Sequence, residues 1–247
     1  MKFILILMVF ITGNLQAQTD FEFIEQQILD SYSVLKKAHL EQNPERQRIF
    51  SAKLKTQLMF ALLQNGSYYH PFLSLGQHVK IVESPDKRVR VFSWDVLSLG
   101  AGRNVCSLVQ YRGVQNESYF NVLSEGNIAT ENHKNVFITA IHLLKNPSGI
   151  PYYLLVGSGS VIKDQEHTTA RIFYFGHNQL SECADCFEGN LPYWTMQGST
   201  QFPVELQYDS RREKLYYYQP SYHPKTGQRK KGLHYQMYWD KGSFKNY

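Results

Sequence analysis

The residues best suited to chemistry in this sequence are two cysteines that lie close together, with two residues between them. They stand in the motif Cys-Ala-Asp-Cys, residues 183 to 186. The spacing fits a structural disulfide, a redox-active dithiol or half of a zinc site. We favour a Cys183–Cys186 disulfide, because Asp185 opposes thiolate formation, the flanking pattern is that of strands, and no second pair of zinc ligands follows. Cys106 lies in an apolar stretch and is predicted to be buried.

Paired carboxylates are the second candidate for chemistry. Glu205 and Asp209 would share one face of a strand and could serve glycoside hydrolysis. The same alternation is expected of an ordinary solvent face. The segment 157–160, Gly-Ser-Gly-Ser, lacks the spacing of a hydrolase nucleophile and is expected to mark a tight turn or bulge. We therefore predict a protein without catalytic residues, metal or cofactor, with a carboxylate-based hydrolase or a thiol redox protein as alternatives.

Aromatic residues near the C-terminus give a stronger indication of function. If the predicted strands 213–218 and 232–239 pair, Tyr216, Tyr218 and Tyr238 point outward together. The opposite, core-facing side would carry Leu215, Tyr217, Leu233, Tyr235, Met237 and Trp239. Flat aromatic rings beside hydrogen-bond donors suit a glycan or a protein partner. The alternative is that these tyrosines are buried beneath the N-terminal helices.

Positive charge is concentrated beside those tyrosines. The chain has a formal net charge of +5, and residues 211–245 hold nine Lys or Arg and two acids. Within this region, Arg229, Lys230 and Lys231 are predicted to lie in a loop next to the tyrosines and to contribute to binding. The charge could meet an anionic surface, but charge runs are usually solvent-facing, and we favour that interpretation. Nucleic acid is not an expected partner of an exported protein.

The N-terminus has the pattern of an export signal. Lys2 precedes an apolar run at residues 3–11, and Leu15-Gln16-Ala17 offers a cleavage site that would leave Gln18 first. The run is shorter than the roughly 20 residues needed to cross a bilayer. We predict a signal peptide at 1–17, no transmembrane segment, and a periplasmic or extracellular mature protein.

The remaining chain divides into a helical part and a strand part. Apolar periodicity predicts helices at 19–42 and 44–64, with Asn43-Pro44 between them and Asn65-Gly66 at the end. These form a helical hairpin within residues 18–66, and residues 67–247 form a β-domain. The predicted strands are 78–83, 88–95, 104–112, 118–123, 136–144, 151–157, 169–176, 202–208, 213–218 and 232–239.

The expected fold is therefore α+β, with the helical hairpin packed on a mostly antiparallel β-meander. A degenerate or partial β-propeller is the alternative, but no repeat of constant length supports it. The strand 88–95 carries large apolar residues on both faces near Trp94. Either a bulge turns Trp94 to the other face, or both faces are covered, with the helical hairpin as the second cover.

Three segments resemble a family of uncharacterised exported proteins of Gram-negative bacteria. They are Ser-Pro-Asp-Lys-Arg-Val-Arg-Val-Phe-Ser-Trp-Asp at 84–95, Pro-Tyr-Tyr-Leu-Leu-Val-Gly-Ser-Gly-Ser at 151–160 and the segment 234–244. The resemblance covers most of the β-region, and its motifs are strand and turn patterns. The resemblance implies export and a β-rich fold, and it transfers no catalytic residue. We expect an envelope-associated protein that binds a glycan or a protein partner through the tyrosines and the basic residues.

Overall fold

The structure is a computed structural model of the chain. It describes residues 2–98, 103–113, 117–126, 132–146, 148–162, 165–176, 179–199, 204–222, 225–226 and 229–246. Side chains are described in these ranges except at 2–20, 132, 161–162, 199, 219–222 and 229–234. The predicted signal peptide at 1–17 therefore lies outside the described side chains.

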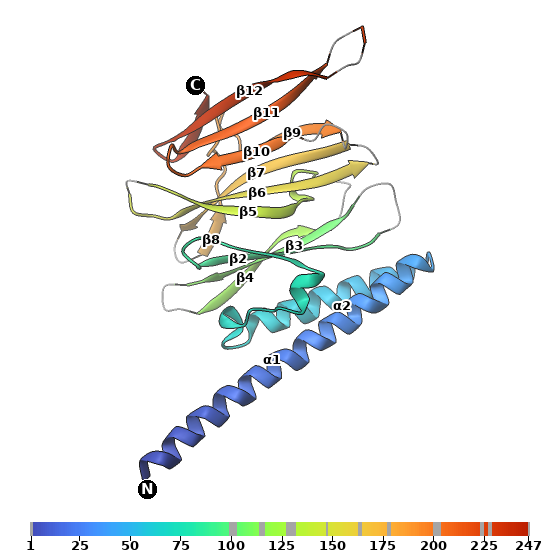
Figure 1. The fold of residues 1–247 in the computed structure, drawn as a ribbon, viewed down its shortest axis with the longest axis vertical. Coiled ribbons are helices and arrows are strands. Elements are labelled where there is room, and N and C mark those ends of the chain that lie inside the picture. The colour runs from blue at the N-terminus through green and yellow to red at the C-terminus, as the bar shows by residue number, and fades with distance from the viewer. Residues whose placement is uncertain are drawn as a thin grey trace.

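Two antiparallel helices form the N-terminal layer (Figure 1). They are α1 (Lys2–Leu40) and α2 (Pro44–Leu63). Asn43 caps α2 by accepting a hydrogen bond from the backbone N–H of Arg46 at 3.0 Å, with Pro44 in the first turn. Gly66, with φ of +83°, adopts the left-handed conformation that ends the hairpin. Within the described part of the chain, no helix has the length and apolar character required to cross a membrane.

Three antiparallel sheets follow the helices, each continuous in sequence. The first sheet contains β1 (Lys80–Glu83), β2 (Val89–Asp95), β3 (Val105–Arg112) and β4 (Ser118–Glu125). The second contains β5 (Phe137–Leu144), β6 (Tyr152–Ile162), β7 (Gln165–Gly176), β8 (Gln179–Glu182) and β9 (Tyr193–Ser199). The third contains β10 (Glu205–Asp209), β11 (Lys214–Tyr222), β12 (Arg229–Asp240) and β13 (Ser243–Asn246). Short 3-10 helices lie at Ser67–Tyr69, Leu75–Gln77 and Asn132–Lys134.

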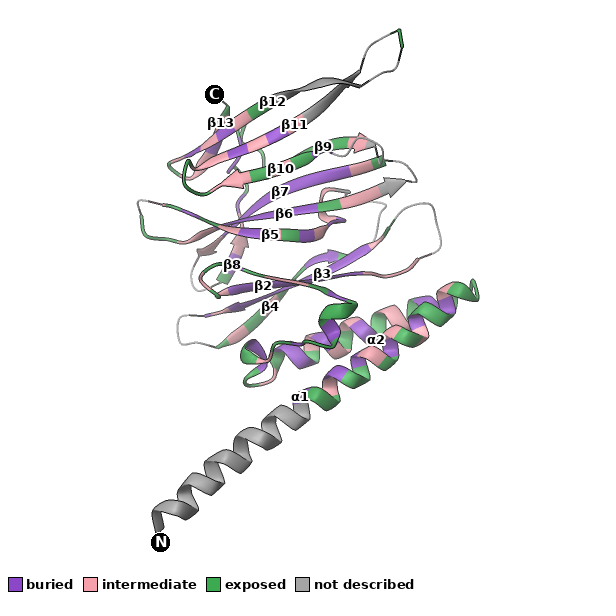
Figure 2. Cartoon of the chain, viewed as in Figure 1, coloured by how far each residue is buried: buried purple, intermediate pink, exposed green. Residues whose placement is uncertain are grey.

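The helices and the three sheets stack as four successive layers (Figure 1). Three apolar cores separate them, and most buried residues lie between layers (Figure 2). The helices pack on one face of the first sheet, whose other face packs on the second sheet. The far side of the second sheet packs on the third. The α+β meander fold is thus confirmed.

The stack bears on the propeller alternative. Each sheet pairs its strands in sequence order, as a propeller blade does. In the second sheet, β8 and β9 both pair with the same edge of β7. The described residues form three such sheets in an open stack, and the helical hairpin covers one end of it. The described residues therefore form stacked meander sheets without a closed ring of blades.

The strand β2 resolves the question raised by Trp94. Its pairing with β1 and β3 is regular, so no bulge turns the side chain. Phe92 and Trp94 pack against the helices, while Val89 and Val91 pack toward the second sheet. Trp94 is fully buried. Both faces of the strand are covered, and the helical hairpin is the second cover.

A buried arginine fastens the end of the helical hairpin to the first sheet. The guanidinium of Arg90 donates hydrogen bonds to the carbonyl oxygens of Ser67 and His70, both at 2.9 Å, and to Oε1 of Gln110 at 2.7 Å. Burial lowers the pKa of Arg90 to about 10. Because two of these bonds go to the turn after α2 and the third goes to β3, this cation of β2 fixes that turn relative to β2 and β3.

The predicted β-domain differs from the structure in two details. Of the turn or bulge expected at the Gly-Ser-Gly-Ser segment, the turn is absent, since the segment lies inside β6, and a register shift of the bulge type lies beside it between Ser160 and Ile162. A Cβ atom at Gly159 would collide with the carbonyl oxygen of Asn135, so the glycine permits a close approach of the backbone. The described strands also include β8, β9 and β13, which the periodicity did not predict.

Candidate functional site

The third sheet places the three predicted tyrosines on one face. In β11, Tyr216 and Tyr218 are two residues apart, which corresponds to about 7 Å along a strand. Tyr238 in β12 lies directly across from Lys214 and therefore diagonally from Tyr216, at about 7–8 Å. All three side chains are half-buried. We call Tyr216, Tyr218 and Tyr238 the tyrosine surface.

Polar residues occupy the neighbouring positions of this face. The strand register puts Tyr216 between Gln207 of β10 and Gln236 of β12. The register sets Glu205 opposite Tyr218, and Lys245 of β13 opposite Tyr238. The tyrosine surface is therefore bordered by amide and charged groups, which supply hydrogen-bond donors and acceptors around the aromatic rings.

The charges on this face are largely matched by nearby partners. Nζ of Lys245 lies 2.7 Å from a carboxylate oxygen of Asp240, and this bond lowers the pKa of Asp240. Nε of Arg212 lies 3.8 Å from Oδ2 of Asp209. Lys214 donates a hydrogen bond to Oε1 of Gln236 at 3.2 Å. Two of the cations on this face, Lys245 and Arg212, thus lie beside carboxylates.

The tyrosine surface is not covered by the helical hairpin. The helices lie at the opposite end of the stack, beyond the first and second sheets (Figure 1). The core-facing side of the third sheet is occupied as predicted at Leu215, Tyr217, Met237 and Trp239, all of which are buried. The alternative in which the tyrosines form a core beneath the helices is therefore wrong.

Other sequence predictions for this region are only partly tested. Tyr235 was expected in the core but is 39% exposed, and its ring stacks on Tyr217 at 5.0 Å between centroids. The basic residues Arg229 and Lys230 begin β12 instead of lying in a loop, since they pair with Tyr222 and Ser221. The side chains of Arg229, Lys230 and Lys231 lie outside the described residues.

The cysteine motif forms the predicted disulfide. Cys183 and Cys186 are bonded, and both are buried in the core between the second and third sheets. The backbone N–H of Phe244 in β13 donates to the carbonyl oxygen of Cys186 at 2.8 Å. The rings of Phe187 and Phe244 stack at 5.7 Å. The disulfide therefore stabilises the segment that receives the last strand.

This environment does not suit the other two interpretations of the motif. Cys183 directly follows β8 rather than opening a helix, so no helix dipole stabilises a thiolate there. Asp185 lies close to both sulfur atoms, and the three residues form the one possible metal-binding group found among the described residues. With both sulfurs bonded to each other, that group offers no thiolate ligand.

The carboxylates proposed for hydrolysis belong to backbone positions that are far apart. Glu205 and Asp209 sit at the two ends of β10, four residues apart, or about 13 Å along an extended strand. Paired catalytic carboxylates lie about 5–9.5 Å apart. Asp209 accepts hydrogen bonds from the backbone N–H groups of Arg212 and Arg211, which lower its pKa. Asp209 thus shapes a turn.

Sequence reasoning missed the two glutamines that border Tyr216. Gln207 and Gln236 share its face in neighbouring strands. The alternation of each strand gave the correct face for Gln236, but only the register between strands shows that the three side chains form one row.

The fold and the site together define a protein of stacked β-meanders with one open aromatic sheet face. Comparison with protein-family models, with curated proteins and with solved structures finds no match for this chain.

Proposed function

We propose that this protein is exported to the cell envelope and binds an uncharged glycan, without catalysis, through the outer face of the third sheet. The observation that carries this proposal is the tyrosine surface, three aromatic side chains on an outer face at spacings of about 7–8 Å. Tyrosine offers a flat apolar ring together with a hydroxyl group, so it can stack on a sugar ring and hydrogen-bond to its substituents.

The polar border of the tyrosine surface favours a neutral ligand. Gln207 and Gln236 flank Tyr216 with groups that both donate and accept hydrogen bonds, as sugar hydroxyls do. The nearby cations Lys245 and Arg212 already lie beside carboxylates. An acidic glycan would have to displace those partners, whereas a neutral one leaves them in place.

Export is supported by two independent features. Residues 1–17 have the charge, apolar run and small residue of a signal peptide. The Cys183–Cys186 disulfide is of the kind that persists in an oxidising compartment. The resemblance to exported proteins of Gram-negative bacteria agrees with both. Mass analysis of the protein purified from its host should give a chain beginning at Gln18, and a chain that retains residues 1–17 would contradict cleavage.

Glycan binding is tested by removing the aromatic rings. The triple variant Tyr216→Ala/Tyr218→Ala/Tyr238→Ala should lose retention on an array of neutral glycans while its melting temperature stays within a few degrees of that of the original protein. Tyr119→Ala is the matched control, because Tyr119 is an exposed tyrosine of β4 in the first sheet. It should bind as the original protein does.

Three results would overturn the proposal. Equal glycan retention by the triple variant would show that another surface binds. A fall of more than about 10 °C in melting temperature would show that the tyrosines are core residues. Capture of an envelope protein by the same face, with no glycan retained, would replace the glycan by a protein partner.

A further inference from the structure

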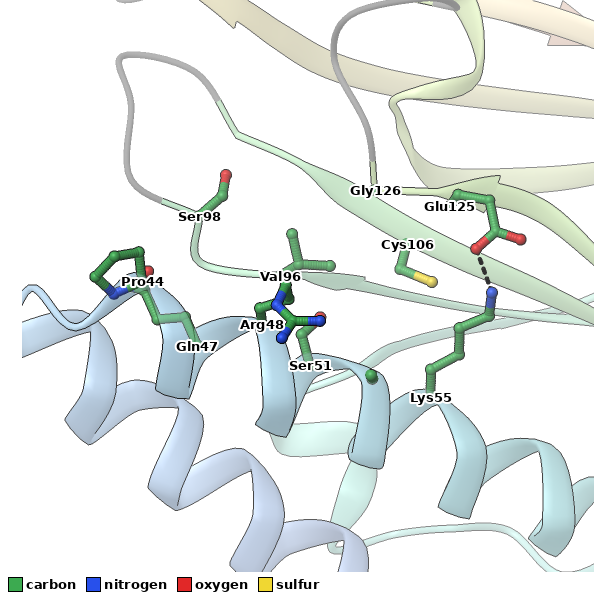
Figure 3. Close-up of a pocket in the computed structure, with 11 residues that line it drawn as sticks. Pro44, Gln47, Arg48, Ser51, Lys55, Val96, Ser98, Cys106, Glu125 and Gly126 are labelled. Carbon is green, nitrogen blue, oxygen red and sulfur yellow. Dashed lines mark hydrogen bonds and ion pairs between the residues drawn. The ribbon is translucent and has the colours of Figure 1, made fainter.

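A groove at the opposite end of the stack has the features of a second ligand site. It has a volume of about 540 Å³, within the usual range for small-molecule sites, and lies between α2 and the strand ends of the first sheet (Figure 3). One wall is the side of α2 that carries Arg48, Ser51 and Lys55. The other wall and floor come from Val96, Ser98, Cys106, Glu125 and Gly126.

The sequence of α2 explains why the groove is open. Residues 44, 48, 51 and 55 recur at three- and four-residue steps and so form one face of the helix. Further along α2, Leu54, Leu58 and Leu62 fill the space between helix and sheet. The small side chains of Ser51 and Ala52 leave it unfilled near the start of the helix.

The wall formed by residues 96–98 is held in place by the helices. Nε2 of Gln47 donates a hydrogen bond to the carbonyl oxygen of Leu97 at 2.9 Å, and Nδ1 of His39 lies 2.8 Å from the same oxygen. The backbone N–H of Val96 donates to the carbonyl oxygen of Asn104 at 2.8 Å. The groove is therefore formed before any ligand arrives.

The charges at the rim favour an anion. Figure 3 shows Lys55 extending from α2 to meet Glu125, with which it forms an ion pair. Arg48 lies about two turns earlier on the same face. No acid within the described ranges forms an ion pair with Arg48. The rim thus has one cation more than it has anions.

The floor of the groove is apolar. Val96 is half-buried there, and Cys106 is 1% exposed. Burial raises the pKa of the Cys106 thiol, so this side chain stays neutral at physiological pH. A ligand that fits both rim and floor has a negatively charged head and a hydrocarbon body.

We propose that this groove binds a small amphipathic carboxylate, with its carboxylate at Arg48 and its hydrocarbon chain against Val96 and Cys106. A guanidinium binds carboxylates through two parallel hydrogen bonds, and the apolar floor adds affinity with each buried methylene. The site does not depend on the proposed glycan function, because it lies on α2 and the first sheet.

The test is a calorimetric titration of the full-length protein with hexanoate, octanoate and decanoate. Affinity should increase about fourfold for each buried methylene, and octanol should bind at least tenfold more weakly than octanoate. Arg48→Gln should lower octanoate affinity at least tenfold and leave octanol binding unchanged. Lys53→Gln is the matched control, since Lys53 is an exposed cation of α2 that does not line the groove.

A second measurement locates the bound ligand. Ala52 lines the groove from α2, so an Ala52→Phe substitution places a large ring at the proposed site. Ala52→Phe should lower the affinity for decanoate at least tenfold, while the melting temperature of the unliganded protein stays within a few degrees of that of the original. The proposal is overturned if no carboxylate binds, if Arg48→Gln binds octanoate as tightly as the original, or if Ala52→Phe binds decanoate as tightly as the original.

Discussion

The first and third sheets are both four-stranded meanders, yet they differ in how many faces are covered. In the first sheet, every residue of β2 from Val89 to Trp94 is buried. In the third, the core-facing residues of β11 are buried, while those on the other face are half-buried. The two sheets show that strand patterning reports how many layers a sheet touches. A sheet at the end of a stack retains one face for a partner.

The largest expected effect on stability comes from truncating a buried side chain in the first sheet. Trp94→Ala removes a fully buried ring between β2 and the helices and should lower the free energy of unfolding by about 3–5 kcal/mol. Urea denaturation measures it. A loss below about 1 kcal/mol would mean that the helices do not cover this face of the sheet.

The junction between the second and third sheets should show an intermediate effect. Cys183→Ala/Cys186→Ala opens a short loop and is expected to cost about 2 kcal/mol. Amide hydrogen exchange should increase most in β13, because Phe244 bonds to Cys186. Unchanged exchange in β13 would show that the disulfide does not support the last strand.

The buried thiol of the first sheet predicts a pH dependence. Burial raises the pKa of Cys106 from 9.0 to about 12, so above pH 9 the unfolded chain loses this proton and the folded protein keeps it. The free energy of unfolding therefore falls as the pH rises from 9 toward 12. The Cys106 thiol accounts for a decrease of up to about 1.4 kcal/mol per pH unit.

The variant Cys106→Ala isolates that contribution. It should lose stability less steeply between pH 9 and 11 than the original protein, whatever its stability at pH 7. Equal slopes for the two proteins would indicate that the folded thiol ionises as an exposed one does.

The smallest expected effect is in the third sheet. Tyr238→Ala removes a half-buried ring from the outer face and should change the free energy of unfolding by about 0.2–1 kcal/mol. Thermal denaturation beside Trp94→Ala gives the direct comparison. If both variants lose similar stability, the outer face of the third sheet is covered in solution.

Much of the fold was predictable because its signals are local. Alternation gave the main strands, and Asn43 and Gly66 marked the helix ends that the structure has. The apolar residues on both faces near Trp94 allowed either a bulge or a second cover, and the structure has the cover. The short strands β8 and β13 were missed because four residues carry too little periodicity to stand out.

The two candidate sites also differ in how far local sequence patterns could predict them. The tyrosine surface follows from alternation within two paired strands, so the sequence predicted it. Tyr235 shows the limit, since alternation gave its face correctly but not its exposure, which depends on the neighbouring layer. The groove beside Arg48 depends on how far a helix stands from strand ends distant in sequence, and no local pattern contains that information.

Each sheet uses one uninterrupted stretch of chain, and the stretches stack in the order in which they occur. A growing polypeptide can therefore complete one layer before the next emerges. Because β11 and β12 belong to the third sheet, the aromatic face is assembled after the helices and the first two sheets. Ligand retention on that face would consequently report that synthesis and folding had passed through the third sheet.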